Sequence, residues 1–471
     1  MTPASIADMG RALRAGQVTA EALAHQALDR IAAHDGAICT FIHLDREGAL
    51  AAARAADTAL AAGRDFGPMH GIPYALKDIF DATGLPTTCH SHLRLGHVAA
   101  EDSAVAARLR TGGAVLLGKL ATYEFAFGGP SFDLPFPPAR NPWNTDHVTG
   151  GSSSGSAAAV AAGFVRMATG SCTAGSIRGP AAWCGAVGLK PTYGRVSRRG
   201  VFPLAWTLDH CGPLARSVED AAIALQVMAG LDTADPGSAD VPVPDFRAGL
   251  EGGVAGLRIG VPRAFFADDP ALTADAGGAI ERAIGWLRAG GAEVRDVTLP
   301  PFAVFQACGR VIMTAEMHAV HRADLQSRPQ DFGESSLKRF VLGAAIGAAD
   351  YIDAQRLRGS LADSVDGVLD RCDALLTAVT LSPPPPFSTT LPPSTWPVQT
   401  NMFNVTGHPA MVVPVGLGSA GFPLSVQLAG RAFDEATLLR IARRIELASG
   451  WLEVPLPRLP SVPRPDIGQA S

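Results

Sequence analysis

The sequence lacks a hydrophobic segment long enough to cross a bilayer. Its longest run of small and apolar residues, residues 157–165, is far shorter than the roughly 20 residues that a membrane-spanning helix needs. The first 34 residues place apolar side chains at helical spacing between charged ones, without the apolar core of a signal peptide. We therefore expect a cytoplasmic protein with no membrane partner.

An excess of basic charge is also missing. The 39 Lys and Arg residues are balanced by 44 Asp and Glu residues, for a formal net charge of −5. Nucleic-acid binders usually carry a basic footprint, so we expect no nucleic-acid partner. Charged residues make up only 18% and hydrophobic residues 47%, which excludes a disordered chain and leaves enough apolar side chains for a large core.

The sequence has few cysteines, and their spacing matches no disulfide or metal-binding motif. The seven cysteines are scattered, and none belongs to a CxxC motif, which favours reduced thiols over a disulfide framework. The stretch Cys89-His90-Ser91-His92 contains three potential metal ligands, but a zinc site needs a fourth ligand and usually spaced pairs. We interpret this stretch as a loop and expect neither a metal nor a cofactor. His210-Cys211 is interpreted as packing rather than as a nucleophile pair.

Helix and strand signals alternate to about residue 230, which predicts a layered α/β fold. Residues 1–62 have the composition and spacing of two or three amphipathic helices, and residues 71–80 and 114–120 read as strands. Residues 232–253 and the proline-rich residues 382–394 are expected to be loops. The remaining expected elements are strands at 257–262, 292–299, 410–415 and 424–429, helices at 102–110, 275–289 and 435–447, and mainly helix over 303–380.

Two glycine-rich stretches resemble known sites. Residues 416–421 spell GxGxxG, but a strand-like segment follows instead of the helix that a dinucleotide site needs, so a hairpin turn is expected. Residues 150–156 (GGSSSGS) resemble a Walker A loop without its lysine and also spell GxSxG around Ser153. A nucleophile elbow must follow a strand, whereas residues 140–149 are rich in turn formers. An elbow with Ser153 as nucleophile stays an alternative.

Three separated segments form a more specific pattern. They are GIPYALKD with Lys77, GGSSSGSAAAVAAG with Ser152, and AGSIRGPAAWCGAVGLKPTYGRVSRRG with Ser176, spaced 75 and 24 residues apart. With ARNPWN, LDHCGPLARSVEDAA and FNVTGHPAMVVPVG, they resemble the amidase signature family along most of the chain. The resemblance implies an α/β fold with a central mixed, twisted β-sheet flanked by helices on both faces.

The same resemblance implies one amidase domain over residues 1–471. Within it, residues 1–62 would form N-terminal helices and residues 63–230 the core that carries the catalytic residues. Residues 231–400 would supply the substrate side, and residues 401–471 the strands and helix that complete the core.

The family resemblance also implies roles for individual residues. Ser176 would be the nucleophile, Ser152 the bridging serine on a cis peptide bond, and Lys77 the base. The remaining assignments are Thr173, Ala174, Gly175 and Ser176 for the oxyanion hole, Ala126, Phe127 and Gly128 for the acyl site, and Ser153 and Arg178 for support of the loops. Taken singly, Lys77 could be a surface lysine and the serines plain helix caps.

The physical chemistry of these residue types agrees with the implied roles. A serine hydroxyl needs a base, and a lysine can act as that base only when it is neutral. Burial in an apolar strand lowers the lysine pKa by penalising the charged form. Cys172 is a departure, because the family usually has Asp there and a thiol is a weaker hydrogen-bonding group. We therefore expect Cys172→Asp to raise activity.

The resemblance implies a serine hydrolase that cleaves C–N bonds of small-molecule amides through an acyl-enzyme, with esters and carbamates (urethanes) as further substrates. Residues 342–358 and the proline-rich loop look more like those of stand-alone hydrolases. The alternatives are the A subunit of a glutamyl-tRNA or aspartyl-tRNA amidotransferase, which would release ammonia from glutamine with a partner, and a non-catalytic relative. The oligomeric state stays open, a homodimer included.

Overall fold

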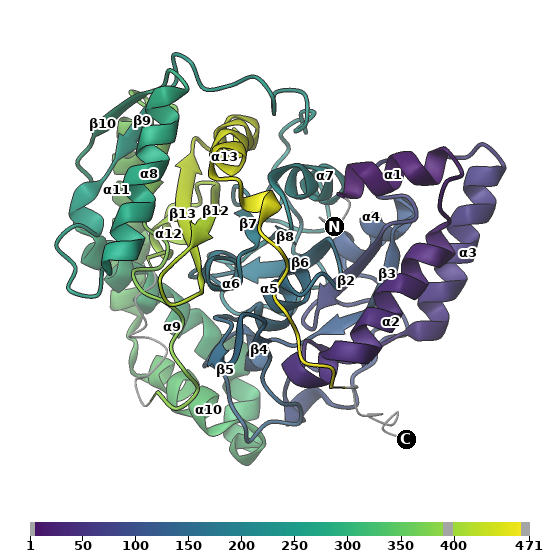
Figure 1. Cartoon of the computed structure of the whole chain (residues 1–471). Coiled ribbons are helices and arrows are strands. Elements are labelled where there is room, and N and C mark those ends of the chain that lie inside the picture. Colours follow the sequence, from purple (N-terminus) through teal and green to yellow (C-terminus); the bar gives the residue numbers. More distant parts are fainter. Residues whose placement is uncertain (1–4, 390–398, 463–471) are drawn as a thin grey trace.

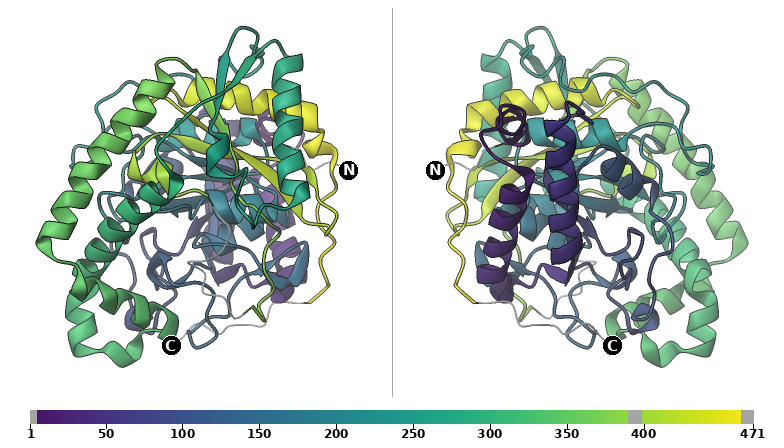
Figure 2. Two further views of the ribbon diagram at one scale, coloured as in Figure 1. Left: turned by 90° about the vertical axis from the view of Figure 1, so that its left-hand side faces the viewer. Right: turned by 90° about the vertical axis from the view of Figure 1, so that its right-hand side faces the viewer.

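The computed structural model describes residues 5–389 and 399–462. An eleven-stranded sheet of mixed direction crosses the molecule in the order β1-β3-β2-β6-β8-β7-β12-β13-β11-β9-β10. Helices pack on both of its sides (Figures 1 and 2). The α/β fold expected from the sequence is confirmed, including the mixed central sheet.

The N-terminal segment forms one end of the sheet (Figure 1). It contains helices α1, α2 and α3, and α2 and α3 pack on each other. The expected helices are confirmed, but the prediction of helices alone over residues 1–62 is wrong at a short strand, β1, which pairs with β3. The elements are α1 (Ile6–Arg14), α2 (Ala20–Ile38), β1 (Phe41–Leu44), α3 (Arg46–Ala61), β2 (Pro73–Lys77), α4 (Ala104–Thr111) and β3 (Val115–Leu120).

The central segment alternates strands and short helices, as predicted. Strand β6 lies between β2, to which it runs parallel, and β8, to which it runs antiparallel. Its elements are β4 (Arg140–Asn141), β5 (Asn144–Val148), α5 (Ser154–Ala161), β6 (Met167–Cys172), α6 (Arg178–Cys184), β7 (Val187–Lys190), β8 (His210–Ala215) and α7 (Val218–Met228).

The second half of the chain completes the sheet and adds a group of helices at its side. Helices α10 and α11 both pack on the long helix α9. The elements are β9 (Arg258–Val261), α8 (Ala274–Ala289), β10 (Glu293–Asp296), α9 (Phe302–Ser327), α10 (Glu334–Phe340), α11 (Ala348–Leu369), β11 (Ala374–Thr377), α12 (Met402–Val405), β12 (Ala410–Leu417), β13 (Pro423–Gly430) and α13 (Glu435–Ser449). Every strand and helix predicted in this half is present, and residues 416–421 connect β12 to β13 as a hairpin.

Two local predictions need correction. Strand β2 stops at Lys77 rather than continuing to residue 80, because the N–H groups of Ile79 and Phe80 turn back to the Lys77 carbonyl oxygen. Strand β11 interrupts the region expected to be mainly helical, since it joins β13 and β9 in the sheet.

The proline-rich segment is a loop in its described part, residues 382–389, as predicted. It is bonded to the end of β5, where the Val148 N–H donates to the Pro385 carbonyl oxygen at 3.1 Å. Residues 390–394 of that prediction lie outside the described part. Among the described helices, none combines the length and the apolar composition that a membrane span requires.

Candidate active site

Lys77 ends strand β2 with its side chain fully buried. Its Nζ lies 2.7 Å from Ser152 Oγ, 2.8 Å from Ser171 Oγ and 3.1 Å from Ser153 Oγ. No carboxylate in the described residues forms an ion pair with it. Burial therefore dominates and lowers the pKa of Lys77 to about 7, so that the neutral amine is accessible near neutral pH.

The pairing of β2 with β6 aims Lys77 at these hydroxyls. The Lys77 N–H donates to Thr169 Oγ1 at 3.0 Å, which ties the end of β2 to the neighbouring strand. Alternate residues of a strand face the same side, so Thr169 and Ser171 both point toward Lys77. The amine thus lies between strand β6 and the loop that carries Ser152 and Ser153.

Two loops bring the serines of the sequence pattern together. Ser152 follows a cis peptide bond from Gly151 in the loop before α5, and Ser176 lies in the loop between β6 and α6. The Ser153 N–H donates to the Ser176 carbonyl oxygen at 3.2 Å, which joins the two loops. Ser152 and Ser176 line the same cavity, whereas the Ser153 side chain is fully buried behind it.

We call this space the acyl cavity; it has a volume of about 340 Å³. The residues expected in the oxyanion hole and the acyl site all lie on its wall, namely Ala126, Phe127, Gly128, Thr173, Ala174, Gly175 and Ser176. The backbone N–H groups of Ala174, Gly175 and Ser176 donate to no acceptor within the described residues, so they are available to a ligand oxygen. Thr400 holds this loop from behind, donating to the Ala174 carbonyl oxygen at 2.7 Å.

Charge in the acyl cavity has one sign. Arg310 of α9 and Arg339 of α10 line it, and no Asp or Glu does among the described residues. Neither guanidinium forms an ion pair with a carboxylate in the described part of the chain. Arg339 donates to the carbonyl oxygen of Gly128 and to the hydroxyl of Ser335, which hold it at the wall. The cavity therefore suits a ligand with an anionic group.

Cys172 and Arg178 lie beneath residues 173–176, which we call the oxyanion loop after their expected role. Arg178 is fully buried and donates to Gln427 Oε1 at 2.6 Å and to Asn404 Oδ1, and its Nη2 is 3.7 Å from Cys172 Sγ. Burial alone would raise the pKa of Cys172, but the Arg178 charge, the Ile177 N–H and Lys190 bring it below its ordinary value. Arg178 thus connects the loop to α12 and β13, the loop-holding position expected from the sequence.

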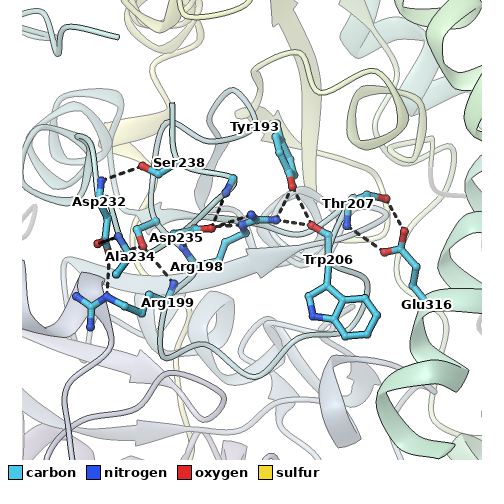
Figure 3. A network of polar contacts seen from close by, with 12 residues as sticks. Tyr193, Arg198, Arg199, Trp206, Thr207, Asp232, Ala234, Asp235, Ser238 and Glu316 are labelled. Atoms are coloured by element: carbon cyan, nitrogen blue, oxygen red, sulfur yellow. Dashed lines mark hydrogen bonds and ion pairs between the residues drawn. The ribbon is translucent and has the colours of Figure 1, made fainter. Parts of the chain in front are cut away.

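A second cavity, of about 240 Å³, reaches the hydroxyl cluster from another side. Ser171 and Asp209 line it, and Ala126 and Leu204 are common to both cavities. Its outer wall is held by a polar network in which Arg198 donates to Asp235 Oδ1 at 3.0 Å and to Tyr193 Oη at 2.7 Å (Figure 3). The Lys77 cluster therefore lies between two hollows.

The competing motifs occupy structural positions. A short strand, β5, does precede the GxSxG stretch, so the expectation of turn residues alone over 140–149 is wrong. Ser153 is nevertheless buried and hydrogen-bonded to Lys77, out of reach of the acyl cavity. His90 is buried with its Nε2 2.8 Å from the Phe136 carbonyl oxygen, and His210 Nδ1 lies 2.7 Å from the Leu208 carbonyl oxygen. The described residues contain no cluster of three or more metal-ligating side chains.

Five residues of the site were not predicted: Ser171, Asp209, Arg310, Arg339 and Thr400. For Ser171 a signal exists, because Thr169 and Ser171 on β6 and Thr173 just after it alternate with small residues. The other four reach the site through loops and helices from distant parts of the chain. No local pattern marks them.

Comparison with known proteins covers nearly the whole chain. A family profile described as "Amidase" matches residues 22–439. The A subunit of the glutamyl-tRNA(Gln) amidotransferase from Roseiflexus sp. (strain RS-1) is 40% identical, over 98% of each chain. A chain of an inhibitor-bound complex, described as a vestigial protein complex that reveals the evolutionary origins of an s-triazine catabolic enzyme, is 36% identical, with a TM-score of 0.89 over 95% of this chain and 99% of that one.

A bacterial aryl acylamidase described as belonging to the amidase signature enzymes is 28% identical, with a TM-score of 0.87 over 97% of this chain and 99% of that one. The preference for a stand-alone hydrolase, drawn from residues 342–358 and the proline-rich loop, finds no support in the curated relatives. Two further relatives, 42% and 40% identical, are also named as A subunits of the glutamyl-tRNA(Gln) amidotransferase.

Proposed function

Since this chain belongs to the amidase signature family, we propose that it hydrolyses a carboxamide through an acyl-enzyme formed on Ser176. The observation that carries the proposal is the Lys77 amine, buried without a carboxylate partner and 2.7 Å from Ser152 at the wall of the cavity that also presents Ser176. A neutral lysine in that position is a general base for the serine pair.

The hydrogen bonds around Lys77 suit proton transfer through Ser152. A neutral amine has two N–H donors and one lone pair, and three hydroxyls surround it. Ser153 Oγ is 3.4 Å from the Ser171 carbonyl oxygen, to which it donates, so it accepts from Lys77. The second N–H goes to Ser171, and the lone pair is left for the Ser152 hydroxyl. Ser152 can then take the Ser176 proton while it gives its own to Lys77.

The acyl transfer follows from this arrangement. Ser176 Oγ attacks the amide carbonyl, and the resulting oxyanion receives hydrogen bonds from the free N–H groups of the oxyanion loop. Lys77 returns its proton through Ser152 to the leaving nitrogen, which departs as ammonia or an amine. A water molecule, deprotonated by the same pair, then attacks the ester on Ser176 and releases the carboxylic acid. Esters and carbamates could enter the same cycle, because the attacked carbonyl is alike.

The substrate is expected to carry a carboxylate or another anionic group. Arg339 and Arg310 have no acidic partner among the described residues, and the half-buried guanidinium of Arg339 favours a bidentate anion. Because the described lining has no acidic residue, nothing there compensates an ammonium group on the ligand. These charges support a small anionic amide.

A second candidate function is that of the A subunit of an amidotransferase, which would release ammonia from glutamine for a partner. The 40% identity to the Roseiflexus protein over nearly the whole of both chains favours it. Glutamine also carries a carboxylate, so Arg339 fits this substrate as well. Its α-ammonium group is the feature that separates the two candidates.

Covalent labelling tests the proposed chemistry. A serine-directed fluorophosphonate should add once to the purified protein, and peptide mapping should locate the adduct on Ser176. Ser176→Ala should abolish the adduct, whereas Ser153→Ala should keep it. An adduct on Ser153, or none on the wild-type protein, would refute the proposal.

Substrate pairs separate the two candidates. Glutamine and glutaramate differ only in the α-ammonium group, and ammonia release from each gives kcat/KM directly. The acid-free lining predicts that glutaramate is at least as good a substrate as glutamine. A preference for glutamine of more than about tenfold, which corresponds to about 1.4 kcal/mol, would favour the amidotransferase function.

A further inference from the structure

Asp209 connects the oxyanion loop to the turn between the two cavities. Its Oδ1 accepts from Thr173 Oγ1 at 2.6 Å, and its Oδ2 accepts from the N–H groups of Leu204 at 2.9 Å and Ala205 at 3.1 Å. Thr173 opens the oxyanion loop, and Leu204 contributes to the wall of both cavities. One carboxylate thus holds two neighbouring walls of the site.

The sheet explains why Asp209 lies there. Strands β6 and β8 are antiparallel, with Cys172 opposite His210 in the last pair of the ladder. Beyond this pair, Thr173 follows Cys172 and Asp209 precedes His210. These two residues would form the next pair of the ladder, and they are joined through their side chains. The distance between the loop and the turn is therefore set by a carboxylate–hydroxyl bond at the point where backbone pairing ends.

The segment that carries Asp209 is itself held on both sides (Figure 3). Arg198 donates to the Trp206 carbonyl oxygen from one side. From the other, Glu316 of α9 accepts from the Thr207 N–H at 3.0 Å and from the Thr207 hydroxyl at 2.6 Å. These bonds fix the segment relative to α9, which also lines the acyl cavity. Asp209 can therefore hold the oxyanion loop in a defined position.

We propose that Asp209 is a positioning residue that holds the oxyanion loop through Thr173. The proposal rests on the proposed function, in which the N–H groups that follow Thr173 receive the oxyanion. Cys172, which ends β6 just before this loop, supplies no carboxylate from beneath, and Asp209 supplies one from the side of the second cavity. Loss of this carboxylate should lower kcat while KM, which depends on the acyl cavity, stays the same.

Ionisation gives a signature that a merely structural residue would lack. Burial raises the pKa of Asp209 to about 6, against the hydrogen bonds from Thr173, Leu204 and Ala205 and the charge of Arg198, which lower it. The charge of Asp209 in turn raises the pKa of Lys77 on β2 and of Cys211 on β8. Above this pH the ionised carboxylate accepts from all its donors; below it, one oxygen carries a proton.

The experiment compares Asp209→Asn with the wild-type protein for labelling rate and pH profile. We expect kcat to fall about 10- to 100-fold with an unchanged KM, and labelling of Ser176 by the fluorophosphonate to slow equally. Below about pH 6 the logarithm of the wild-type rate should fall with a slope near two, from Lys77 and Asp209 together, and with a slope near one in the variant. Equal labelling rates and equal slopes would overturn the proposal.

Two substitutions of Thr173 test the proposal independently if Asp209→Asn does not fold. Thr173→Val removes the hydroxyl donor and should reproduce the loss of kcat, whereas Thr173→Ser keeps the donor and should restore most of it. Asp220→Asn is the matched control: this buried carboxyl also has a raised pKa, about 7, but bonds the Ile6 N–H far from the site. It should lower stability without changing kcat or the slope.

The outcomes are distinguishable from failure of the proposed function. Absence of labelling on wild-type Ser176 would refute that function and this inference with it. Normal wild-type labelling, together with equal activity of the Thr173→Val and Thr173→Ser proteins, would refute the inference alone.

Discussion

Ser153 and Ser176 are joined through their backbones, because the N–H of Ser153 donates to the carbonyl oxygen of Ser176 at 3.2 Å. Ser153 also accepts a hydrogen bond from Lys77 through its side chain at 3.1 Å. The loop before α5, the loop before α6 and the end of β2 are therefore parts of one hydrogen-bonded unit. Changes in any of these three places should affect the same reaction steps.

Activity should rise with pH through the titration of Lys77. Burial lowers its pKa to about 7, and only the neutral amine, present above that pH, can accept a proton. We expect kcat/KM to reach a plateau about one pH unit above the midpoint. Steady-state rates in buffers of constant ionic strength test this. Lys77→Arg should be inactive at every pH, since a guanidinium is not deprotonated, and a maximum on the acid side of about pH 6 would contradict Lys77 as the base.

Removal of the Ser171 hydroxyl should move that midpoint to lower pH. The hydroxyl, 2.8 Å from Nζ, stabilises the ammonium form, so Ser171→Ala should lower the Lys77 pKa by about 0.5–1 unit. The plateau of kcat should fall about 3- to 10-fold, because the amine is less well oriented. Ser156→Ala is the matched control, since buried Ser156 donates to the Thr169 carbonyl oxygen and not to Lys77. A midpoint that stays in place would count against this contact.

Cys172→Asp should raise kcat about 3- to 10-fold and move the acid limb to higher pH. The new carboxylate would pair with Arg178, which has no carboxylate partner in the described chain, and would hold the oxyanion loop more firmly. Its charge would also stabilise protonated Lys77, because Cys172 already acts on Lys77 in that direction. Cys172→Ser, which adds no charge, is the control. An equal or lower plateau of kcat would refute the prediction.

Arg339→Met should remove the preference for anionic substrates. Hydrogen bonds to charged groups contribute about 1.5–3 kcal/mol, so the kcat/KM ratio of glutaramate to a neutral amide of similar size should fall at least about tenfold. Arg310→Met should have a smaller effect, because Arg310 is exposed at the cavity and its charge is screened by solvent. Parallel assays of both amides with each variant test the ranking. Unchanged ratios in both variants would exclude an anionic subsite.

Lys119→Met should destabilise the fold rather than change the chemistry. Lys119 Nζ on β3 lies 2.9 Å from Oδ1 of Asp78, the residue after Lys77, and both side chains are fully buried. Removal of one partner leaves an uncompensated buried charge, which costs about 3–5 kcal/mol. Urea unfolding followed by fluorescence measures the change. The double variant Lys119→Met with Asp78→Asn should lose less, and a single-variant loss below about 1 kcal/mol would contradict the pairing.

The sequence predicted the long helices well and the short strands poorly. Long helices such as α8 and α13 were found within a few residues, because their periodic apolar faces extend over several turns. Strands β1 and β11 were missed because four residues carry too little pattern to compete with neighbouring helices. Their assignment depends on partners that only the sheet order supplies.

Within the site, residues that were named from the family pattern, such as Lys77 and Ser152, lie together in the structure, and their catalytic roles stay predictions. Prediction failed for Ser171, whose side chain matters only because β6 lies beside β2. Arg339 and Asp209 could not be found locally, since a cationic helix residue and a turn aspartate are ordinary features of a solvated surface. Their significance arises from the tertiary contacts of α10 and of the segment before β8.

The two walls of the acyl cavity come from different parts of the chain. Ser152 and the loop of residues 173–176, which would carry the chemistry, come from the first half of the chain, whereas Arg310 of α9 and Arg339 of α10 line the cavity from the second half. Selection for a new substrate can therefore act on the helical wall while the chemistry is inherited unchanged. A protein divided in this way is evolvable, and a library confined to the cavity-facing positions of α9 and α10 is the economical way to redirect it.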